Sequence, residues 1–272
     1  MTPEEHRQSV LAWRARRDAR LRDPDGWLTL VGLHWLAPGE NRFGSDPGND
    51  LVLAGADVPA EIGSLLLEGR NVILRRPGHA DLPMATDISG EPTVLDVATL
   101  RMYVAERGER FGLRVRDHAS PALATFAGMD HFDIDSGWRL ASRLERAAPG
   151  ATLEIMDVIG VMLREPTPGT VRFERDGREW SVDALPGGEN GSLWLVFADA
   201  TNGRSTYGGG RFLYTEPVAS DGSVVLDFNL AYNPPCVFTP YATCPLPPQQ
   251  NRLPLAIEAG ERNYRAAAGH LT

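Results

Sequence analysis

The chain has 272 residues, of which 42% are hydrophobic and 23% are charged, and this composition is that of a globular protein and excludes a disordered chain. Its 27 basic and 36 acidic residues give a formal net charge of −9, which argues against nucleic acid or an anionic membrane surface as the main partner. All 27 basic residues are arginine, so Schiff-base, P-loop-lysine and lysine general-base chemistry are excluded.

Targeting signals and cysteine usage indicate the compartment. No N-terminal apolar run resembles a signal peptide, and no run of eighteen apolar residues would span a bilayer. Cys236 and Cys244 are too few for a disulfide framework in a chain of this length. We therefore expect a cytoplasmic protein with no membrane partner, in which the two cysteines are buried free thiols or a redox-linked pair.

The N-terminus predicts a helix over residues 3–22. Thr2 is a capping residue, proline occupies the first helical position and Glu5 follows three residues after the cap. Side chains recur at helical spacing at Val10, Trp13, Arg17 and Leu21. We expect this helix to pack partly on the body, with its arginines at the surface. The apolar run 27–36 then predicts a core strand bent at Gly32.

Residues 37–90 are predicted to form a small β-sandwich-like domain. Short strands separated by Gly, Asp and Pro turns are expected at 40–43, 49–53, 62–67 and 71–75. The pattern Arg-Phe-Gly-x-Asp-Pro-x-Asn-Asp-Leu-Val-Leu over 42–53 resembles the opening of forkhead-associated domains, which bind phosphothreonine. Ser45 stands where those domains usually have arginine, and their Ser-x-x-His signature is absent. The resemblance implies a sandwich shape.

The later chain predicts a mainly β fold. Further strands are expected at 100–104, 111–116, 152–164, 170–174, 179–182, 193–198 and 224–229, with a helical turn or two at 121–127. Because no regular βαβ alternation appears, we expect antiparallel sandwich or barrel-like sheets with an N-terminal helix and a C-terminal helix over 261–268. The predicted divisions are an N-terminal helix and core strand over 1–36, the small sandwich over 37–90 and a β-rich core domain over 91–272.

Residues 130–135, Asp-His-Phe-Asp-Ile-Asp, alternate carboxylates and an imidazole with apolar side chains. Alternation along a strand would place Asp133 and Asp135 on one face. A metal site needs ligands that converge from several elements, whereas the charged outer face of an edge strand needs only this pattern. We favour the edge strand and expect no metal and no cofactor.

The stretch 191–261 concentrates the polar residues that could form a site. Three glycines precede Arg211, and they either bring backbone amides close to a ligand or form a β-bulge. Without a following Gly-Lys-Ser/Thr, a nucleotide P-loop is excluded. Asp227 and Asn229 share one face of a strand end, and Arg211 is the expected partner of Asp227, in an ion pair or a ligand site.

The motifs of this stretch resemble one protein family. They are Phe-Ala-Asp-Ala-Thr-Asn-Gly at 197–203, Thr-Tyr-Gly-Gly-Gly-Arg at 206–211 and Asp-Phe-Asn-x-Ala-Tyr-Asn-Pro-Pro-Cys at 227–236. With Cys-Pro-Leu-Pro-Pro at 244–248 and Ala-Gly-Glu at 259–261, they are similar to the DUF1684 family of bacterial and archaeal proteins. The resemblance implies where a site lies and implies no activity.

We therefore predict one polar pocket in a soluble β-rich protein. Its catalytic residues would be Asp227 and Glu258, acting as general acid or base, and its binding residues would be Arg211, Asn229, Tyr232, Asn233, Tyr207 and Asp199. The expected function is a metal-independent hydrolase or lyase that acts on a small anionic metabolite. The alternatives are a non-enzymatic binding or scaffold protein that recruits a protein partner through the forkhead-associated-like sandwich, and a sealed structural network onto which no pocket opens.

Overall fold

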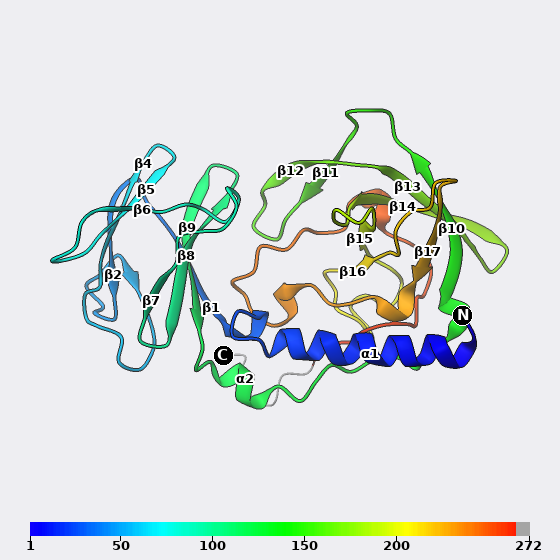
Figure 1. Ribbon diagram of the computed structural model, residues 1–272, viewed down its shortest axis with the longest axis horizontal. Coiled ribbons are helices and arrows are strands. Elements are labelled where there is room, and N and C mark those ends of the chain that lie inside the picture. Colours follow the sequence, from blue (N-terminus) through cyan, green and yellow to red (C-terminus); the bar gives the residue numbers. More distant parts are fainter. Residues whose placement is uncertain (265–272) are drawn as a thin grey trace. The chain divides into compact units, whose positions relative to one another are not determined.

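A computed structural model describes residues 1–264. The fold is mainly β, with antiparallel sheets and a helix near the N-terminus, as predicted (Figure 1). The chain divides into two compact units. Unit 1 comprises Met1–Arg20, Ala127–Phe238 and the chain from Thr243 onward, and unit 2 comprises Leu21–Phe126 and Thr239–Ala242. This grouping differs from the three predicted divisions, because the segment 91–126 lies in the same unit as the predicted small sandwich.

Unit 2 consists of two sheets that share one core. The four-stranded sheet contains, in spatial order, β1 (Leu30–Trp35), β9 (Arg110–Asp117), β8 (Leu100–Arg107) and β7 (Leu95–Val97). The five-stranded sheet contains β3 (Leu51–Val52), β2 (Gly39–Gly44), β4 (Gly63–Glu68), β5 (Asn71–Arg75) and β6 (Leu82–Pro83). Phe43 and Leu65 from one sheet and Met102 and Leu113 from the other belong to a single apolar cluster. The strand β1 has a register irregularity between Leu30 and Gly32, where a bend was expected.

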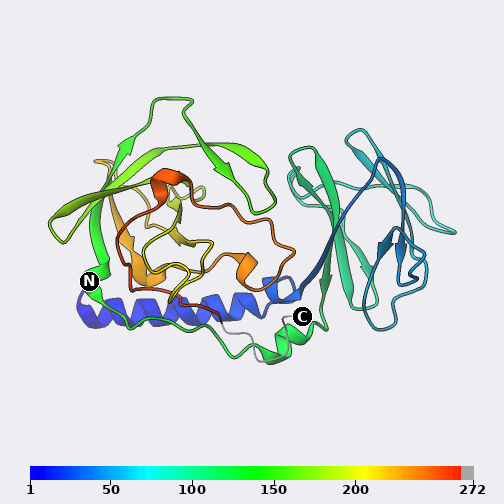
Figure 2. The same cartoon turned by 180° about the vertical axis from the view of Figure 1, so that it is seen from behind.

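Unit 1 is built on a six-stranded antiparallel sheet that curls into a half-barrel (Figures 1 and 2). In spatial order its strands are β16 (Arg211–Tyr214), β15 (Leu193–Phe197), β14 (Arg178–Pro186), β13 (Gly169–Arg175), β10 (Arg139–Arg146) and β17 (Ser223–Asp227). Val171 and Phe173 alternate with the exposed Arg172 along β13, so one face of the sheet is apolar. This face packs on Phe228, whose ring centroid lies 5.5 Å from that of Phe197.

The helix α1 (Pro3–Leu21) begins at the predicted capping box. The Thr2 hydroxyl accepts a hydrogen bond from the Glu5 amide at 3.2 Å, and the Glu5 carboxylate accepts one from the Thr2 nitrogen at 2.7 Å. Within unit 1, α1 is held largely by polar contacts. Arg17, which was expected at the surface, is 7% exposed and bonds to the Glu261 carboxylate. The expectation of surface arginines is therefore wrong for Arg17.

Three predicted elements differ from the structure. Residues 130–135 do not form an edge strand and make only an isolated bridge between His131 and Glu261. The predicted strand 152–164 is the hairpin of β11 (Thr152–Met156) and β12 (Met162–Pro166), because Asp157 accepts hydrogen bonds from the turn amides of Ile159 and Val161. Residues 261–264 are not helical, and the rest of the predicted C-terminal helix lies outside the described residues. The helix α2 (Pro121–Thr125) forms where one or two helical turns were expected.

Candidate functional site

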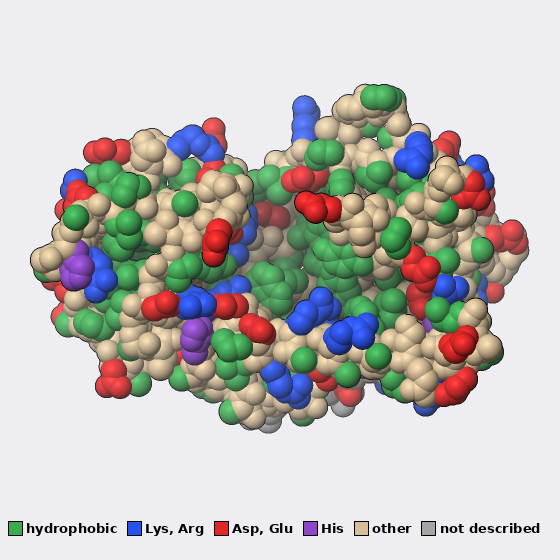
Figure 3. Space-filling view, viewed as in Figure 1, with side chains coloured by type: hydrophobic (Ala, Val, Ile, Leu, Met, Phe, Trp, Pro, Cys, Tyr) green, Lys and Arg blue, Asp and Glu red, His purple; other side chains and the backbone are tan. Residues whose placement is uncertain are grey.

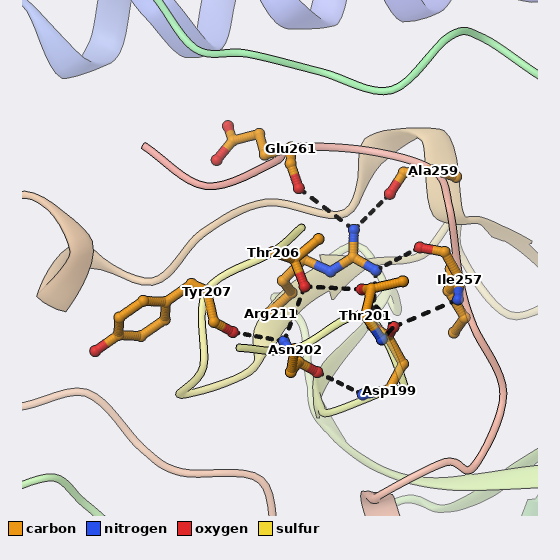
Figure 4. Close-up of polar contacts among 9 residues, drawn as sticks. All are labelled: Asp199, Thr201, Asn202, Thr206, Tyr207, Arg211, Ile257, Ala259 and Glu261. Atoms are coloured by element: carbon orange, nitrogen blue, oxygen red, sulfur yellow. Dashed lines mark hydrogen bonds and ion pairs between the residues drawn. The ribbon is translucent and has the colours of Figure 1, made fainter. Parts of the chain in front are cut away.

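Arg211 lies at the start of β16 and is completely buried, with 0% exposure. Its Nη2 donates to Asp199 Oδ2 at 2.7 Å and to the Ile257 carbonyl at 2.8 Å, and its Nη1 donates to the Ala259 carbonyl at 2.5 Å (Figure 4). Burial lowers the pKa of the guanidinium, and the Asp199 carboxylate acts in the opposite direction. Since water does not reach the group, Arg211 fixes the segment 257–261 against β16.

The glycines before Arg211 permit this burial. Gly210 has a φ of +94°, and a Cβ atom there would lie 2.4 Å from the Pro247 ring and 2.7 Å from the Phe197 carbonyl oxygen. Gly208 would meet only backbone atoms of Gly203 at 3.7 Å or beyond. Glycine is required at 210 by close packing within the protein, which is neither the approach to a ligand nor the β-bulge that was expected of the triplet.

Asp199 begins a polar turn that supports the same network. Its Oδ1 accepts hydrogen bonds from the Thr201 amide at 2.8 Å and the Thr201 hydroxyl at 2.6 Å. The Asn202 side chain bonds to the Thr206 hydroxyl and to the Tyr207 carbonyl. Figure 4 shows the Tyr207 ring pointing away from Arg211. Both carboxylate oxygens of Asp199 are therefore engaged in holding protein groups.

Asp227 has a different partner from the one expected. Its Oδ2 lies 2.6 Å from Nε2 of His6 on α1, and its Oδ1 accepts from the Asn229 amide and side chain at 3.1 and 2.8 Å. Asn229 also bonds to the backbone of Asp135 through both side-chain atoms. The predicted pair between Arg211 and Asp227 is wrong, because Asp199 takes the guanidinium.

A third polar group surrounds Glu261, which is 0% exposed. Its carboxylate accepts from Arg17 Nε at 3.0 Å and from the Asn233 amide at 2.7 Å. Burial raises the pKa of Glu261, while the Arg17 charge acts to lower it. The Arg17 guanidinium also lies 4.8 Å above the ring of Tyr232, and burial raises the pKa of that phenol well above its ordinary value. Glu258, expected beside Arg211, is exposed to solvent.

Apart from the exposed Glu258, the predicted site residues thus separate into networks around Asp199, Asp227 and Glu261. His6 and Arg17 were missed as site residues, because they contact residues 221 and 244 positions later in the chain. No local pattern in the sequence encodes such pairings. The only signal for the burial of charged side chains on α1 is its narrow apolar stripe, which is too small to hold the helix by apolar contacts alone.

A small open pocket lies next to the Glu261 segment. It has a volume of about 280 Å³ and is lined by Asp130, His131, Arg204, Ser205, Arg262 and Asn263. We call it the Arg204–Arg262 pocket. Its walls are tied together by backbone: the Arg262 amide donates to the Asp130 carbonyl at 2.8 Å, and the Asn263 amide donates to the Ser205 carbonyl at 3.0 Å. The Asn263 side chain also donates to the Arg204 carbonyl at 2.8 Å.

His131 is the titratable imidazole of this pocket. Burial, followed by the positive charge of Arg14, lowers its pKa from the ordinary 6.5 to about 4, so the ring is neutral at pH 7. A hydrogen bond to the Met129 backbone acts in the opposite direction. Its Nε2 is buried and has no hydrogen-bond partner among the described residues. Sequence analysis singled out His131 only within a proposed edge strand.

Cys236 and Cys244 form a disulfide in the proline-rich loop. Of the two states expected for these residues, buried free thiols and a redox-linked pair, the structure has the linked pair. Asn233, three residues before Cys236, donates from its side chain to the Arg262 carbonyl at 2.7 Å. The loop therefore connects the disulfide to one wall of the Arg204–Arg262 pocket.

The fold and these networks define a half-barrel protein whose segment 257–261 is held by buried polar contacts. The family described as "Protein of unknown function (DUF1684)" matches residues 124–262, just over half of the chain, so the chain belongs to the DUF1684 family. A solution NMR structure of an uncharacterized protein from Haloarcula marismortui is 33% identical, covers 50% of this chain and 77% of its own, and has a TM-score of 0.42. No curated protein matches the chain.

Within residues 1–264, no group of three or more His, Cys, Asp or Glu side chains is arranged to hold a metal ion. In the same part of the chain, no helix is both long and apolar enough to cross a bilayer.

Proposed function

We propose that unit 1 binds a small anionic molecule in the Arg204–Arg262 pocket. The observation that carries this proposal is the state of the two arginines: among the described residues, no carboxylate forms an ion pair with Arg204 or Arg262. The side chain of Arg262 instead lies 5.2 Å from the Phe132 ring centroid. Guanidinium groups are strong donors to carboxylates and phosphates, which makes an anion the natural ligand.

The volume of the pocket and the charge distribution of the protein favour a small ligand that is attracted by the pocket residues themselves. A volume of about 280 Å³ lies at the lower end of the range for ligand pockets. The face of the molecule in Figure 3 carries acidic and arginine side chains that are spread among each other. Attraction of an anion would therefore come from the pocket itself, since the net charge of −9 opposes it at long range.

As part of this proposal, the reaction is the one expected from the sequence, hydrolysis or elimination on a small anion. His131 is the imidazole that lines the pocket. In hydrolysis, its Nε2 would give a proton to the leaving group as the bond to that group breaks, and would recover a proton from the water whose oxygen bonds to the substrate. Asp227 and Glu258 do not line this pocket, and their catalytic roles stay predictions.

The test is binding of inorganic phosphate, sulfate and succinate by isothermal titration calorimetry. Arg204→Gln and Arg262→Gln should each weaken binding at least about tenfold, because each removes one charged donor. Arg252→Gln is the matched control, since Arg252 is an exposed arginine of the same unit outside the pocket. Unchanged affinity in both pocket variants, or an equal loss in the control, would show that the anion binds elsewhere.

The alternative function is a scaffold protein that recruits a partner through unit 2, whose two sheets share one core. Polar side chains of the 42–53 pattern bond to a neighbouring segment of unit 2: the Ser45 hydroxyl donates to the Val58 carbonyl at 2.8 Å, and the Asn49 side chain donates to the Ala60 carbonyl at 2.7 Å. Binding of a phosphothreonine peptide, abolished by Arg42→Gln and absent for the unphosphorylated peptide, would favour this alternative.

A further inference from the structure

One residue that lines the Arg204–Arg262 pocket has a basic nitrogen that is not used by the fold. His131 lines the pocket, and its Nε2 is buried without a hydrogen-bond partner in the part of the chain that the structure describes. The hydrogen bond to the Met129 backbone belongs to the other ring nitrogen, Nδ1, which therefore carries the proton of the neutral ring. Nε2 is left with a lone pair and can take up a second proton.

The charges around the ring explain why that proton is absent in the empty pocket. The charged groups that act on His131 are Asp130 beside it and Arg14 and Arg17 on α1. Arg204 and Arg262 line the same pocket. Glu261 and Asp133 act on Arg14 and so offset part of its charge. Positive charge thus predominates near a ring that is already partly removed from water, and both conditions disfavour an imidazolium.

A bound ligand changes this balance according to its own charge. The two arginines and the one aspartate that line the pocket have a net charge of +1, which a monoanion neutralises. A dianion would leave one uncompensated negative charge in a small pocket beside a buried lone pair, which is costly. Protonation of His131 neutralises the extra negative charge and converts the lone pair into a hydrogen-bond donor, because the imidazolium supplies the missing positive charge.

We propose that the Arg204–Arg262 pocket takes up a small dianion together with one proton, which Nε2 of His131 holds. This inference rests on the proposed function, since it needs an anion in the same pocket. It names the ligand class as a dianion, such as a phosphate monoester or a dicarboxylate, and it makes binding strongest on the acidic side of neutrality.

The test uses sulfate as the probe, because sulfate stays a dianion across the working pH range and any proton taken up must reside on the protein. Calorimetric titrations of the full chain at about pH 6, in several buffers with different ionisation enthalpies, give the number of protons taken up for each sulfate bound. We expect close to one. Nitrate, a monoanion, should bind with almost no proton uptake. Sulfate affinity should fall about tenfold per pH unit between the pKa of about 4 that His131 has in the empty pocket and the higher pKa that it has in the complex, and should level off above the latter.

Variants locate the proton. His131→Gln should bind sulfate with no proton uptake and with a flat pH dependence, whereas His79→Gln, a change at an exposed histidine of unit 2, should behave like the unmodified protein. If His131→Gln fails to fold, the NMR titration of the His131 ring with and without sulfate gives the same answer in the unmodified protein.

The outcomes separate the two proposals. Sulfate binding without proton uptake overturns the inference and leaves the proposed anion site intact, as does uptake that persists in His131→Gln. If none of sulfate, phosphate, succinate and nitrate binds, the proposed function itself fails. An uptake close to one that is lost with His131 supports both.

Discussion

At the residue scale, the arginine that stands out most in the sequence has a structural role. Arg211 donates to Asp199 and to the carbonyls of Ile257 and Ala259. Its side chain therefore holds a segment of irregular backbone in place, as the backbone hydrogen bonds of a sheet hold a strand. A buried charge is tolerated only when its donors are satisfied. The two carbonyl bonds and the ion pair meet most of that need, and Gly210 provides the room for them.

We expect Gly210→Ala to destabilise unit 1 by about 3 kcal/mol, because it combines overpacking against Pro247 with a positive φ at a residue other than glycine. Gly208→Ala, two residues earlier, should change stability by less than about 0.5 kcal/mol. Urea unfolding of both variants measures the difference. Equal effects would mean that the triplet is not packed as described.

The pKa of His131 predicts a pH dependence of stability. Because its pKa is about 4 in the folded protein, against an ordinary 6.5, the unfolded chain binds more protons between these values. This contribution is complete above pH 6.5 and is lost as the pH falls toward 4. Its size is on the order of 2 kcal/mol once partial exposure is allowed for.

The measurement is the free energy of unfolding from pH 4 to 8, in buffer without sulfate or phosphate. His131→Gln should remove part of the slope between pH 4 and 6.5, and His79→Gln should leave it unchanged. A slope that is identical in the His131 variant would assign the acid sensitivity to other groups.

Sequence reasoning located the polar stretch and failed on its pairings. It identified Arg211, Asp227 and Asn229 as buried polar groups, because charged side chains beside apolar strands need partners. It assigned Arg211 to Asp227, although Asp199 is the partner. Such choices depend on how strands are arranged in space, and the sequence alone does not fix that arrangement. His131 was missed as a pocket residue because residues 130–135 are a loop.

At the element scale, the sequence predicts helices and strands from local patterns, but it does not predict contacts between distant parts of the chain. The capping box of α1 and most strands of both units follow from rules that act over a few residues. The turn inside 152–164 was missed, because Asp157 was the only polar signal of the turn between apolar residues. The docking of α1 through His6 and Arg17 depends on partners more than 200 residues away.

The proline-rich loop gives a prediction at this scale. Cys236 and Cys244 are eight positions apart, and closing a loop of this length reduces the entropy of the unfolded chain by an amount worth about 2–3 kcal/mol. Reduction should lower the stability of unit 1 by that amount. It should also speed hydrogen exchange at the Val158 amide, which donates to the Cys244 carbonyl.

The matched control is the double variant Cys236→Ala and Cys244→Ala. It should have the stability of the reduced protein and show no response to a dithiol reductant. A response in the double variant, or full stability of the reduced protein, would show that the disulfide does not constrain this loop.

At the scale of the whole molecule, the chain has two separate apolar cores. Leu65 in unit 2 and Leu195 in unit 1 are both 0% exposed. Each leucine-to-alanine change should cost about 2–5 kcal/mol, and it should speed hydrogen exchange mainly in its own unit. Loss of protection in both units from either change would indicate that the two cores unfold as one.

The order in which the chain is made has a consequence for α1. Arg17 cannot pair with Glu261 until the 244 residues that separate them have been synthesised. At ordinary rates of synthesis this takes about 12 to 50 s. During that time unit 2, encoded between the segments of unit 1, can finish folding while the helix remains in water with its arginines hydrated. A helix with a broad apolar stripe would be open to aggregation in the same interval. We therefore expect the charged docking face of α1 to protect the unfinished chain from aggregation until its last strand and C-terminal segment are made.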